Sequence, residues 1–399
     1  EGYFIDTSSG TITMTLPSSP SAGNIVALKD YANTFDTNRL TIGRNGSNIG
    51  GEAKDAAIVV EGQALTLVYA DSTKGWLAVE AATDADLPKP AFIAATGGTV
   101  TTVCTNFKVH TFTGPGTFCV SAVGNAAGSN TVDYLVVAGG GGGGRWYGGG
   151  GGAGGYRFSD GTASGCFTTA PGPLSPLGAS ALPVTATGYP VTVGGGGTGG
   201  SFTPDVRSTN GSNSVFTGSS TITSAGGGGG GGNSSGCFPT HYPGTNGGSG
   251  GGGKSNTTLT GSAGAGNTPS VSPPQGFPAG TSSNPDQNAG GGGAGGASNP
   301  ATTDGTSGGF GGAGIASSIT GSPVGRGGGG SGNSATGSYG NANPTGAPFG
   351  GGVSNSPTTS GSSGTANTGG GGGAGPLCGS QTNAGTGGSG IVIIRYKFQ

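Results

Sequence analysis

The residue types that commonly carry catalysis are scarce in this chain and poorly grouped. It has two histidines and 16 acidic residues among 399. His110 lies in the alternating stretch 107–112, where a structural role in a strand is expected. His241, with Cys237 and Cys166, offers three zinc ligands, one fewer than a structural zinc site needs. Because nothing in the sequence places two carboxyl groups at glycosidase spacing, we expect no enzyme activity, no metal and no cofactor.

Five cysteines are present, so at least one thiol is unpaired within a monomer. Cys104 and Cys119 end two short strand-like runs joined by turn residues. A disulfide between them is one expectation, and it would imply an oxidising exterior; two small buried residues are the alternative. A second possible disulfide joins Cys166 to Cys237, and Cys378 could replace either partner.

Aromatic residues of the second part of the chain lie mostly in segments that connect glycine blocks. Such rings serve recognition when they stack on sugars or fill receptor pockets. The alternative is that they pack over the open ends of the glycine segments and shield them from water. Trp146 and Tyr147, which stand between two glycine blocks, are the strongest candidates. The full candidate receptor-binding set is Trp146, Tyr147, Phe167, Phe238, His241, Tyr242, Phe277, Tyr339 and Phe349.

The composition excludes several classes of protein. Charged residues make up 8% and the formal net charge is −2, which gives no electrostatic footprint for nucleic acid or an anionic membrane. No apolar run approaches the ~18 residues that span a bilayer. Glycine does not recur at every third position, so the chain is not collagen. The 99 glycines and 24 prolines therefore need another explanation.

Glycine is distributed unevenly, and this divides the chain. Residues 138–399 hold 84 of the 99 glycines. We expect an N-terminal all-β module at 1–90 for attachment or docking, a short β unit at 91–137, and a glycine-rich domain at 138–399. No stretch has a helical period. Alternating apolar residues predict strands at 11–16 and 107–112. Further strand-like stretches between turn signals are 24–28, 39–42, 57–60, 64–69, 76–79, 99–104, 117–123, 132–137, 189–193, 214–217, 221–224 and 391–398.

The glycine blocks predict an unusual backbone structure. Ordering a glycine costs about 1–2 kcal/mol and buries no side chain, so an ordered block must pair its N–H and C=O groups. The polyproline-II helix has three residues per turn and no internal hydrogen bonds. Only glycine lets several such helices approach and bond on all sides. We therefore predict a mainly β and irregular fold with essentially no α-helix, ending in a bundle of polyglycine-II rods whose variable loops gather at the rod tips.

Several stretches are similar to a known family. Residues 132–138 followed by the glycines at 139–144, then 151–157, and the ending 388–396 resemble the glycine-rich domain of bacteriophage tail-fibre proteins. Residues 111–118 resemble its lead-in strand. Residues 2–7 and 40–47 look like a β module of fibres from phages of aquatic bacteria. In relatives of this family, glycine blocks pack as a polyglycine-II sandwich and loops at its far end bind a host receptor.

The resemblance implies a non-enzymatic tail-fibre or fibre-tip adhesin that binds a bacterial surface protein or glycan. The alternative is a structural subunit that assembles head-to-tail into a fibre through its N-terminal module. A polysaccharide depolymerase is a third possibility. We expect an extracellular protein, in a virion tail fibre or a filament, with other fibre or virion subunits or itself as further partners. Neither nucleic-acid binding nor membrane insertion is expected.

Overall fold

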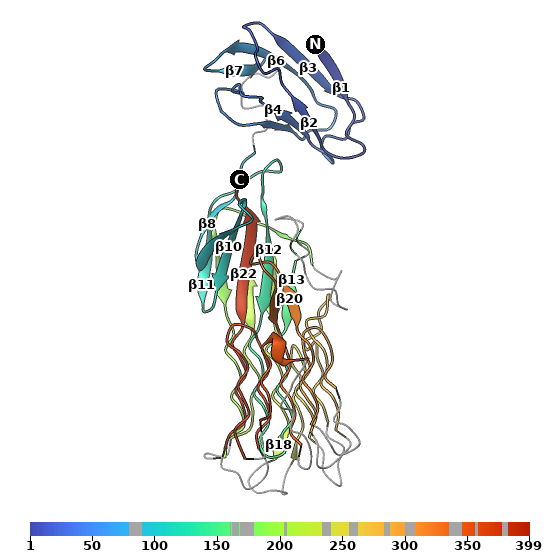
Figure 1. The fold of residues 1–399 in the computed structure, drawn as a ribbon, viewed down its shortest axis with the longest axis vertical. Helices are drawn as coiled ribbons and strands as arrows, with labels where there is room; N and C mark the ends of the chain where they lie inside the picture. The colour runs from blue at the N-terminus through green and yellow to red at the C-terminus, as the bar shows by residue number, and fades with distance from the viewer. Residues whose placement is uncertain are drawn as a thin grey trace. The chain divides into compact units, whose positions relative to one another are not determined.

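The computed structural model describes most of the chain, which is mainly β and irregular (Figure 1). The described residues are 1–79, 90–159, 161, 167, 179–202, 206–233, 241–254, 262–282, 288–299, 308–334, 345–355, 358–376 and 382–399. They form two compact units. One comprises Glu1–Ala94, Ala122–Asn130 and Phe398–Gln399, and the other Ala95–Ser121 and Thr131–Lys397.

The first unit is built from two small sheets. One has the order β1-β3-β6-β7 and the other β2-β4-β5, with parallel pairs β1–β3 and β2–β4. Both sheets contribute to one core, which includes Phe35, Leu40, Leu67 and Trp76. The strands are β1 (Gly2–Ile5), β2 (Ile12–Thr15), β3 (Ile25–Asp30), β4 (Leu40–Gly43), β5 (Ala56–Ile58), β6 (Ala64–Asp71) and β7 (Gly75–Ala78).

Two larger sheets begin the second unit. The first has the order β13-β12-β22-β10-β9, with β14 also paired to β12, and the second β17-β16-β15-β11-β8. Their strands are β8 (Ala94–Thr96), β9 (Thr99–Val103), β10 (Phe107–Phe112), β11 (Gly116–Ala122), β12 (Thr131–Val137), β13 (Tyr156–Phe158), β14 (Leu182–Pro183), β15 (Gly188–Thr192), β16 (Ser214–Thr217), β17 (Thr221–Ser224) and β22 (Ile391–Lys397).

The sheet of β12 and β22 is buried on both faces. Ring contacts of His110 and Tyr396 with Phe118 join one face to the sheet of β11. The opposite face forms a second core with the hairpin of β20 (Ile315–Ser317) and β21 (Val324–Arg326), through residues such as Ile393 and Ile315. Burial on both faces explains the continuous apolar run of β22.

The glycine segments leave these sheets as extended rods that lie side by side (Figure 1). Along 139–144 the three neighbours that accept the N–H groups repeat every three residues, which is the period of a polyglycine-II helix. The bonds are Gly139 to Ser212, Gly142 to Thr209, Gly140 to Gly388, Gly143 to Gly385, Gly141 to Gly152 and Gly144 to Gly149.

The rod at 139–144 is surrounded by six others. Its six N–H groups donate to three rods, and its six carbonyls accept from three more, at 197–200, 227–230 and 372–375, with N···O distances of 2.8–3.1 Å. No backbone polar group of this rod is left unpaired, as ordered glycine requires. A Cβ added at Gly141 would lie 2.1 Å from the Gly228 carbonyl oxygen. That direction is taken instead by a Cα–H bond, so weak Cα–H···O contacts complete the packing.

Ala153 interrupts one of these glycine blocks and is fully buried. It stands three residues before Tyr156, the first residue of β13, where the rod meets the sheets. The lattice therefore accepts a methyl group near the sheets, while the middle of the block is glycine.

The strand predictions are largely confirmed, with several elements missed. β1, β8, β13 and β14, the hairpin β20–β21, and the short pair β18 (Gly232–Asn233) and β19 (His241–Tyr242) were not predicted. The stretch predicted as a short β unit at 91–137 is divided between the two compact units, because Ala122–Asn130 belongs to the first. The described residues contain a single helix, the 3₁₀ turn η2 (Ala347–Phe349).

The expected Cys104–Cys119 disulfide is not formed, and the alternative of two buried residues is also wrong. Both thiols are free and exposed. Cys104 follows β9 in one sheet with a left-handed φ of 48°, and Cys119 points outward from β11 in the other. Cys166, Cys237 and Cys378 lie outside the described residues.

Candidate binding site at the far end of the glycine rods

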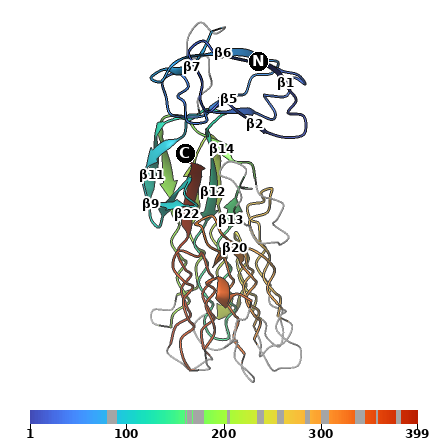
Figure 2. The same cartoon turned by 45° about the horizontal axis from the view of Figure 1, so that its top comes forward.

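The rods of the second unit have one end at the sheets and a far end. The rod at 139–144 continues from β12 and the rod at 149–155 returns to β13, so residues 145–148 form a turn at the far end. β18, which pairs with β19, lies at this end (Figure 1). Figure 2 shows the same rods in a turned view. Tyr147 N–H donates to the Pro376 carbonyl at 3.3 Å, and Asn333 N–H donates to that of Gly148 at 3.2 Å. Residues from four parts of the sequence therefore meet at this end.

The turn at 145–148 holds two aromatic residues in an uncommon backbone conformation. Trp146 and Tyr147 have φ values of 43° and 57°, which bulky residues adopt only when their surroundings hold them there. Trp146 is 5% exposed and packs against Phe202, with ring centroids 5.4 Å apart. The tryptophan thus covers the end of the lattice, and Tyr147 remains partly exposed.

Three cations at this end each lie over an aromatic ring. Arg145 lies 4.5 Å from the Trp146 centroid, Arg207 lies 4.7 Å from that of Tyr242, and Lys254 lies 5.1 Å from that of Tyr147. Cation–π pairs of this kind are worth about 0.5–2 kcal/mol each, more when water is excluded. We call these six residues the basic-aromatic cluster.

Backbone carbonyls fix the two arginines of the cluster. Arg145 is buried, and it donates from Nε to the Asn233 carbonyl at 3.0 Å and from Nη1 to that of Ser201. Arg207 is exposed and donates from Nη2 to the Pro243 carbonyl at 3.0 Å. Arg145, Arg207, Ser208, Asn233 and Tyr242, with glycine backbone, line one small pocket.

Burial shifts the pKa of Lys254, a member of the cluster. Its side chain is 6% exposed, and burial lowers the pKa of its ammonium group to about 8. It remains mostly protonated at neutral pH. The cluster therefore carries three positive charges at pH 7.

The predicted site residues separate into two groups. Trp146, Tyr147, Tyr242 and the backbone of His241 lie at the far end of the rods. Phe167 and Phe277 pack on the core of the β22 sheet. Phe349 lies in η2 beside β21, where a Cβ at Gly325 would meet its ring at 2.7 Å. Phe238 and Tyr339 lie outside the described residues.

The sequence did not identify Phe202 or the three cations of the cluster as site residues. A signal existed for Arg145, because it directly precedes the two aromatic residues that stood out between glycine blocks. Arg207 and Lys254 lie far away in the sequence and had none. Their meeting depends on which rods are neighbours.

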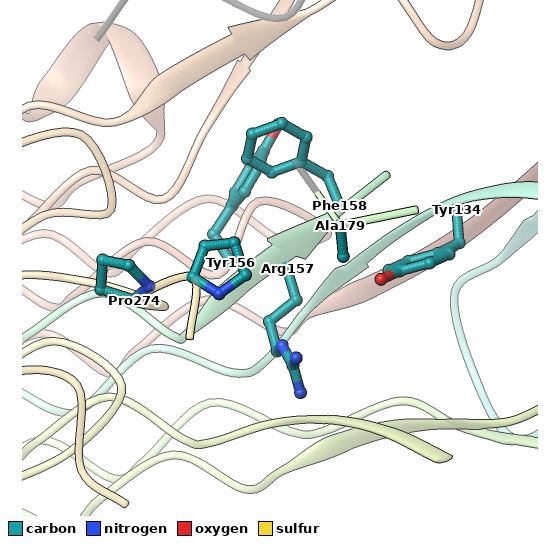
Figure 3. A pocket seen from close by; sticks show the side chains of 7 residues that line it. Tyr134, Tyr156, Arg157, Phe158, Ala179 and Pro274 are labelled. Carbon is teal, nitrogen blue, oxygen red and sulfur yellow. The ribbon is translucent and has the colours of Figure 1, made fainter. Parts of the chain in front are cut away.

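A second pocket lies beside the sheets (Figure 3). It is lined by Tyr134, Tyr156, Arg157, Phe158, Ala179, Pro273 and Pro274. Arg157 extends to the opposite side from the Phe158 ring, as alternation along β13 requires (Figure 3). Burial raises the pKa of the Tyr156 hydroxyl, which therefore stays protonated at neutral pH.

Among the residues that the structure describes, no three His, Cys, Asp or Glu side chains lie close enough to hold a metal ion. Within the described ranges, no helix has the length and apolar character that a bilayer crossing needs.

Comparison with known proteins assigns the chain to a family through its glycine-rich part. A family model described as a glycine-rich domain matches residues 113–397. A search of curated proteins gives no match to the sequence. The matched region runs from the residues just before β11 to the end of β22, and so includes the rods and most of both larger sheets. Because it covers more than half of the chain, this protein belongs to the glycine-rich domain family.

Proposed function

We propose that this protein is a non-enzymatic, extracellular receptor-binding protein of the bacteriophage tail-fibre or fibre-tip type. In this proposal the far end of the glycine rods binds a protein or glycan on a bacterial surface. The observation that carries the proposal is the basic-aromatic cluster, three cation–aromatic pairs at one end of a rigid lattice. The resemblance of the sequence to phage tail-fibre proteins is the reason for proposing that the receptor lies on a bacterial surface.

Physical chemistry favours this end of the molecule for recognition. Tyrosine, tryptophan and arginine dominate the binding energy of many interfaces. Binding residues are commonly held on connecting segments by a rigid scaffold. A lattice that pairs its backbone groups in all directions is such a scaffold, and little conformational entropy is lost when it binds.

The test compares tyrosines in binding of the labelled full chain to a panel of bacterial cells. Tyr242→Ala removes a ring of the cluster, whereas Tyr31→Ala removes an exposed ring of the first unit. We expect Tyr242→Ala to weaken cell binding at least about tenfold, a hot-spot effect of about 1.4 kcal/mol, and Tyr31→Ala to leave it unchanged. If Tyr31→Ala alone weakens binding, the receptor site is not at the rod ends.

A specific observation also favours the alternative of head-to-tail assembly. Phe4 and Tyr31 are 77% and 70% exposed on the first unit, and their rings lie 6.5 Å apart. Phe4 belongs to β1, an edge strand, and edge strands readily pair with other chains. Under this alternative, electron microscopy of the full chain shows filaments that Phe4→Ser abolishes. A monodisperse monomer at high concentration would rule it out for this chain alone.

A further inference from the structure

A buried arginine stands where the hairpin β20–β21 meets the core of the β22 sheet. Arg326 is the last residue of β21 and pairs with Ile315 of β20. Residues directly opposite each other in an antiparallel pair share a face, and Ile315 belongs to the core that also contains Tyr156. The Arg326 side chain therefore points into this core, where it is 6% exposed.

Two N–H groups of the Arg326 guanidinium lack an acceptor. Nε and Nη1 are buried, and neither has a hydrogen-bond partner within the described part of the chain. Burial lowers the pKa of this guanidinium, and Tyr156 is the titratable group that acts on it. Because a buried charge without a partner is costly, such charges in proteins are normally paired.

Another buried arginine on this face of the β22 sheet shows the usual solution. Arg395 on β22 lies directly opposite Asp133 on β12, a buried carboxylate whose charge favours the guanidinium. Tyr156, the neighbour of Arg326, pairs instead with Val137. Val137 is four residues further along β12, a distance of about 13 Å along a strand. Arg326 therefore needs a different counter-charge.

The Tyr156 hydroxyl lies beside this guanidinium and is also unpaired. A Cβ on Gly327, the residue after Arg326, would lie 3.6 Å from the Tyr156 ring, and the two side chains interact electrostatically. Tyr156 is 1% exposed, and its Oη has no hydrogen-bond partner among the residues described. Burial raises the pKa of the hydroxyl, so it is a hydrogen-bond donor at neutral pH.

Ser317 adds a third donor to this place. It lies on the buried face of β20, and its side chain acts on the Tyr156 hydroxyl. Its Oγ accepts the Ile319 N–H at 3.3 Å, so the hydroxyl hydrogen is what it can donate. Three donors select a ligand that accepts hydrogen bonds, and the charge of Arg326 selects an anion. Because all three side chains are almost fully buried, this anion is a small ion and not a substituent of a larger molecule.

We propose that Arg326, Tyr156 and Ser317 bind one halide ion, chloride, in the interior of the second unit. The ion balances the charge of Arg326 and joins the hairpin β20–β21 to β13. A water molecule would satisfy the donors but would leave the charge unbalanced. The inference concerns the scaffold and does not depend on the proposed receptor-binding function.

Thermal unfolding of the full chain against chloride concentration tests the proposal. Sodium chloride replaces sodium isethionate, whose anion is too large for the site, at constant ionic strength. A ligand that binds only the folded state raises the melting temperature. Between about 1 and 300 mM chloride, we expect a rise of at least about 4 °C for a Kd of about 10 mM. A melting temperature that does not depend on chloride would overturn the proposal.

Matched variants separate this site from general salt effects. Arg326→Met removes the buried charge, and Arg157→Met removes the half-buried arginine that follows Tyr156 on β13 (Figure 3). We expect Arg326→Met to abolish the chloride dependence and to melt no lower than the parent at the lowest chloride, because it removes an uncompensated buried charge. Tyr156→Phe should reduce the chloride dependence, and Arg157→Met should keep it in full. Equal chloride dependence in Arg326→Met and Arg157→Met would contradict the site.

Bromide locates the ion without any variant. Crystals of the full chain soaked in sodium bromide should show an anomalous-scattering peak in contact with Arg326 Nε and Tyr156 Oη. A peak elsewhere only, or none, would overturn the proposal even if stability depends on chloride. A peak at the site without chloride-dependent unfolding would mean an adventitious ion only, and would overturn it too.

Discussion

At the scale of single residues, Lys254 shows what the far end of the rods costs in stability. Its ammonium group is almost fully buried over the Tyr147 ring, and burial lowers its pKa from 10.5 to about 8. Below about pH 8 the folded protein holds a charge that water would solvate better. Strongly shifted pKa values of this kind cluster at functional sites.

Replacing this lysine is therefore expected to stabilise the protein. Lys254→Met should raise the free energy of unfolding by roughly 1–3 kcal/mol at pH 7, because the pKa shift sets the upper limit and the lost cation–π contact offsets part of it. The unfolded chain binds the proton more tightly, so parental stability should rise from pH 8 to 10.5 and the advantage of the variant should shrink. Denaturant unfolding against pH measures this, with Lys108→Met on β10 as control. A destabilised variant at pH 7 would contradict it.

Asp30 gives the opposite pH dependence in the first unit. Burial alone would raise the pKa of this carboxyl, but N–H groups of Phe35, Gly62 and Thr34 donate to it at 2.9–3.2 Å, and the net effect lowers the pKa. The folded state therefore favours the carboxylate. Its contribution is fully present above the unfolded pKa of about 3.9 and is lost as pH falls below that value.

A tryptophan makes this prediction measurable. Trp76 lies in the core of the first unit, and Trp146→Phe leaves it as the only tryptophan. In that background, Asp30→Asn should lower the stability of the first unit by about 1–3 kcal/mol at pH 7 and remove the acid dependence below about pH 4. Asp36→Asn, at an exposed position, should change neither. An unchanged acid dependence in Asp30→Asn would assign it to another group.

The site was predictable from the sequence only for residues that are adjacent in the chain. Trp146 and Tyr147 were identifiable because two aromatic residues stood between glycine blocks, although Trp146 proves buried. Phe167 also lies in a segment that connects glycine blocks, yet it packs in the core of the β22 sheet. Trp146 and Tyr147 differ from Phe167 because residues 145–148 form the turn between two rods. This position depends on the tertiary structure and cannot be read from residue type.

At the scale of elements, the glycine rod is the feature that most needs a direct test. Gly151 and Gly195 both belong to rods with φ outside the left-handed region, but their surroundings differ. A Cβ at Gly151 would lie 2.1 Å from the Gly141 carbonyl oxygen, whereas one at Gly195 would meet nothing within 4 Å. The pair separates the effect of lattice packing from the effect of losing a glycine.

The two alanine substitutions should therefore have opposite consequences. Gly151→Ala should destabilise the second unit by at least about 3 kcal/mol or prevent its folding, because the methyl group overlaps a neighbouring rod. Gly195→Ala should be neutral or stabilising by up to about 1 kcal/mol, because it restricts the unfolded chain. Thermal unfolding of both variants measures this. Similar effects at the two positions would argue against a close-packed lattice. Gly229 is a less sensitive position, since its nearest contacts are at 3.1 Å.

The elements were predictable to the extent that their signal is local. Alternation identified β10, short apolar runs between turn signals identified β12 and β22, and backbone pairing requirements identified the rods. The neighbours of each rod were not predictable, because one glycine block is chemically like another. β1, β20 and β21 were missed because each is three or four residues long and acquires its partner from distant sequence.

At the scale of the whole molecule, the scaffold and the basic-aromatic cluster occupy different parts of the second unit. The sheet of β12 and β22, which is buried on both faces, holds one end of the rods. Backbone hydrogen bonds on all sides hold the rods together, and the basic-aromatic cluster occupies their far end. The low content of charged residues follows, because the interior of the lattice is backbone and needs no side chain.

Hydrogen–deuterium exchange of the full chain, read by mass spectrometry, tests the central claim that glycine forms the core of this scaffold. Cleavage at Tyr134, Trp146 and Tyr156 isolates the rods at 139–144 and 149–154. Their amides should exchange at least about a thousandfold more slowly than those of an unfolded chain, an opening free energy of about 4 kcal/mol, and as slowly as those of β22. Exchange of both glycine peptides at the unfolded rate, with β22 still protected, would mean that the glycine blocks are linkers and would contradict the account.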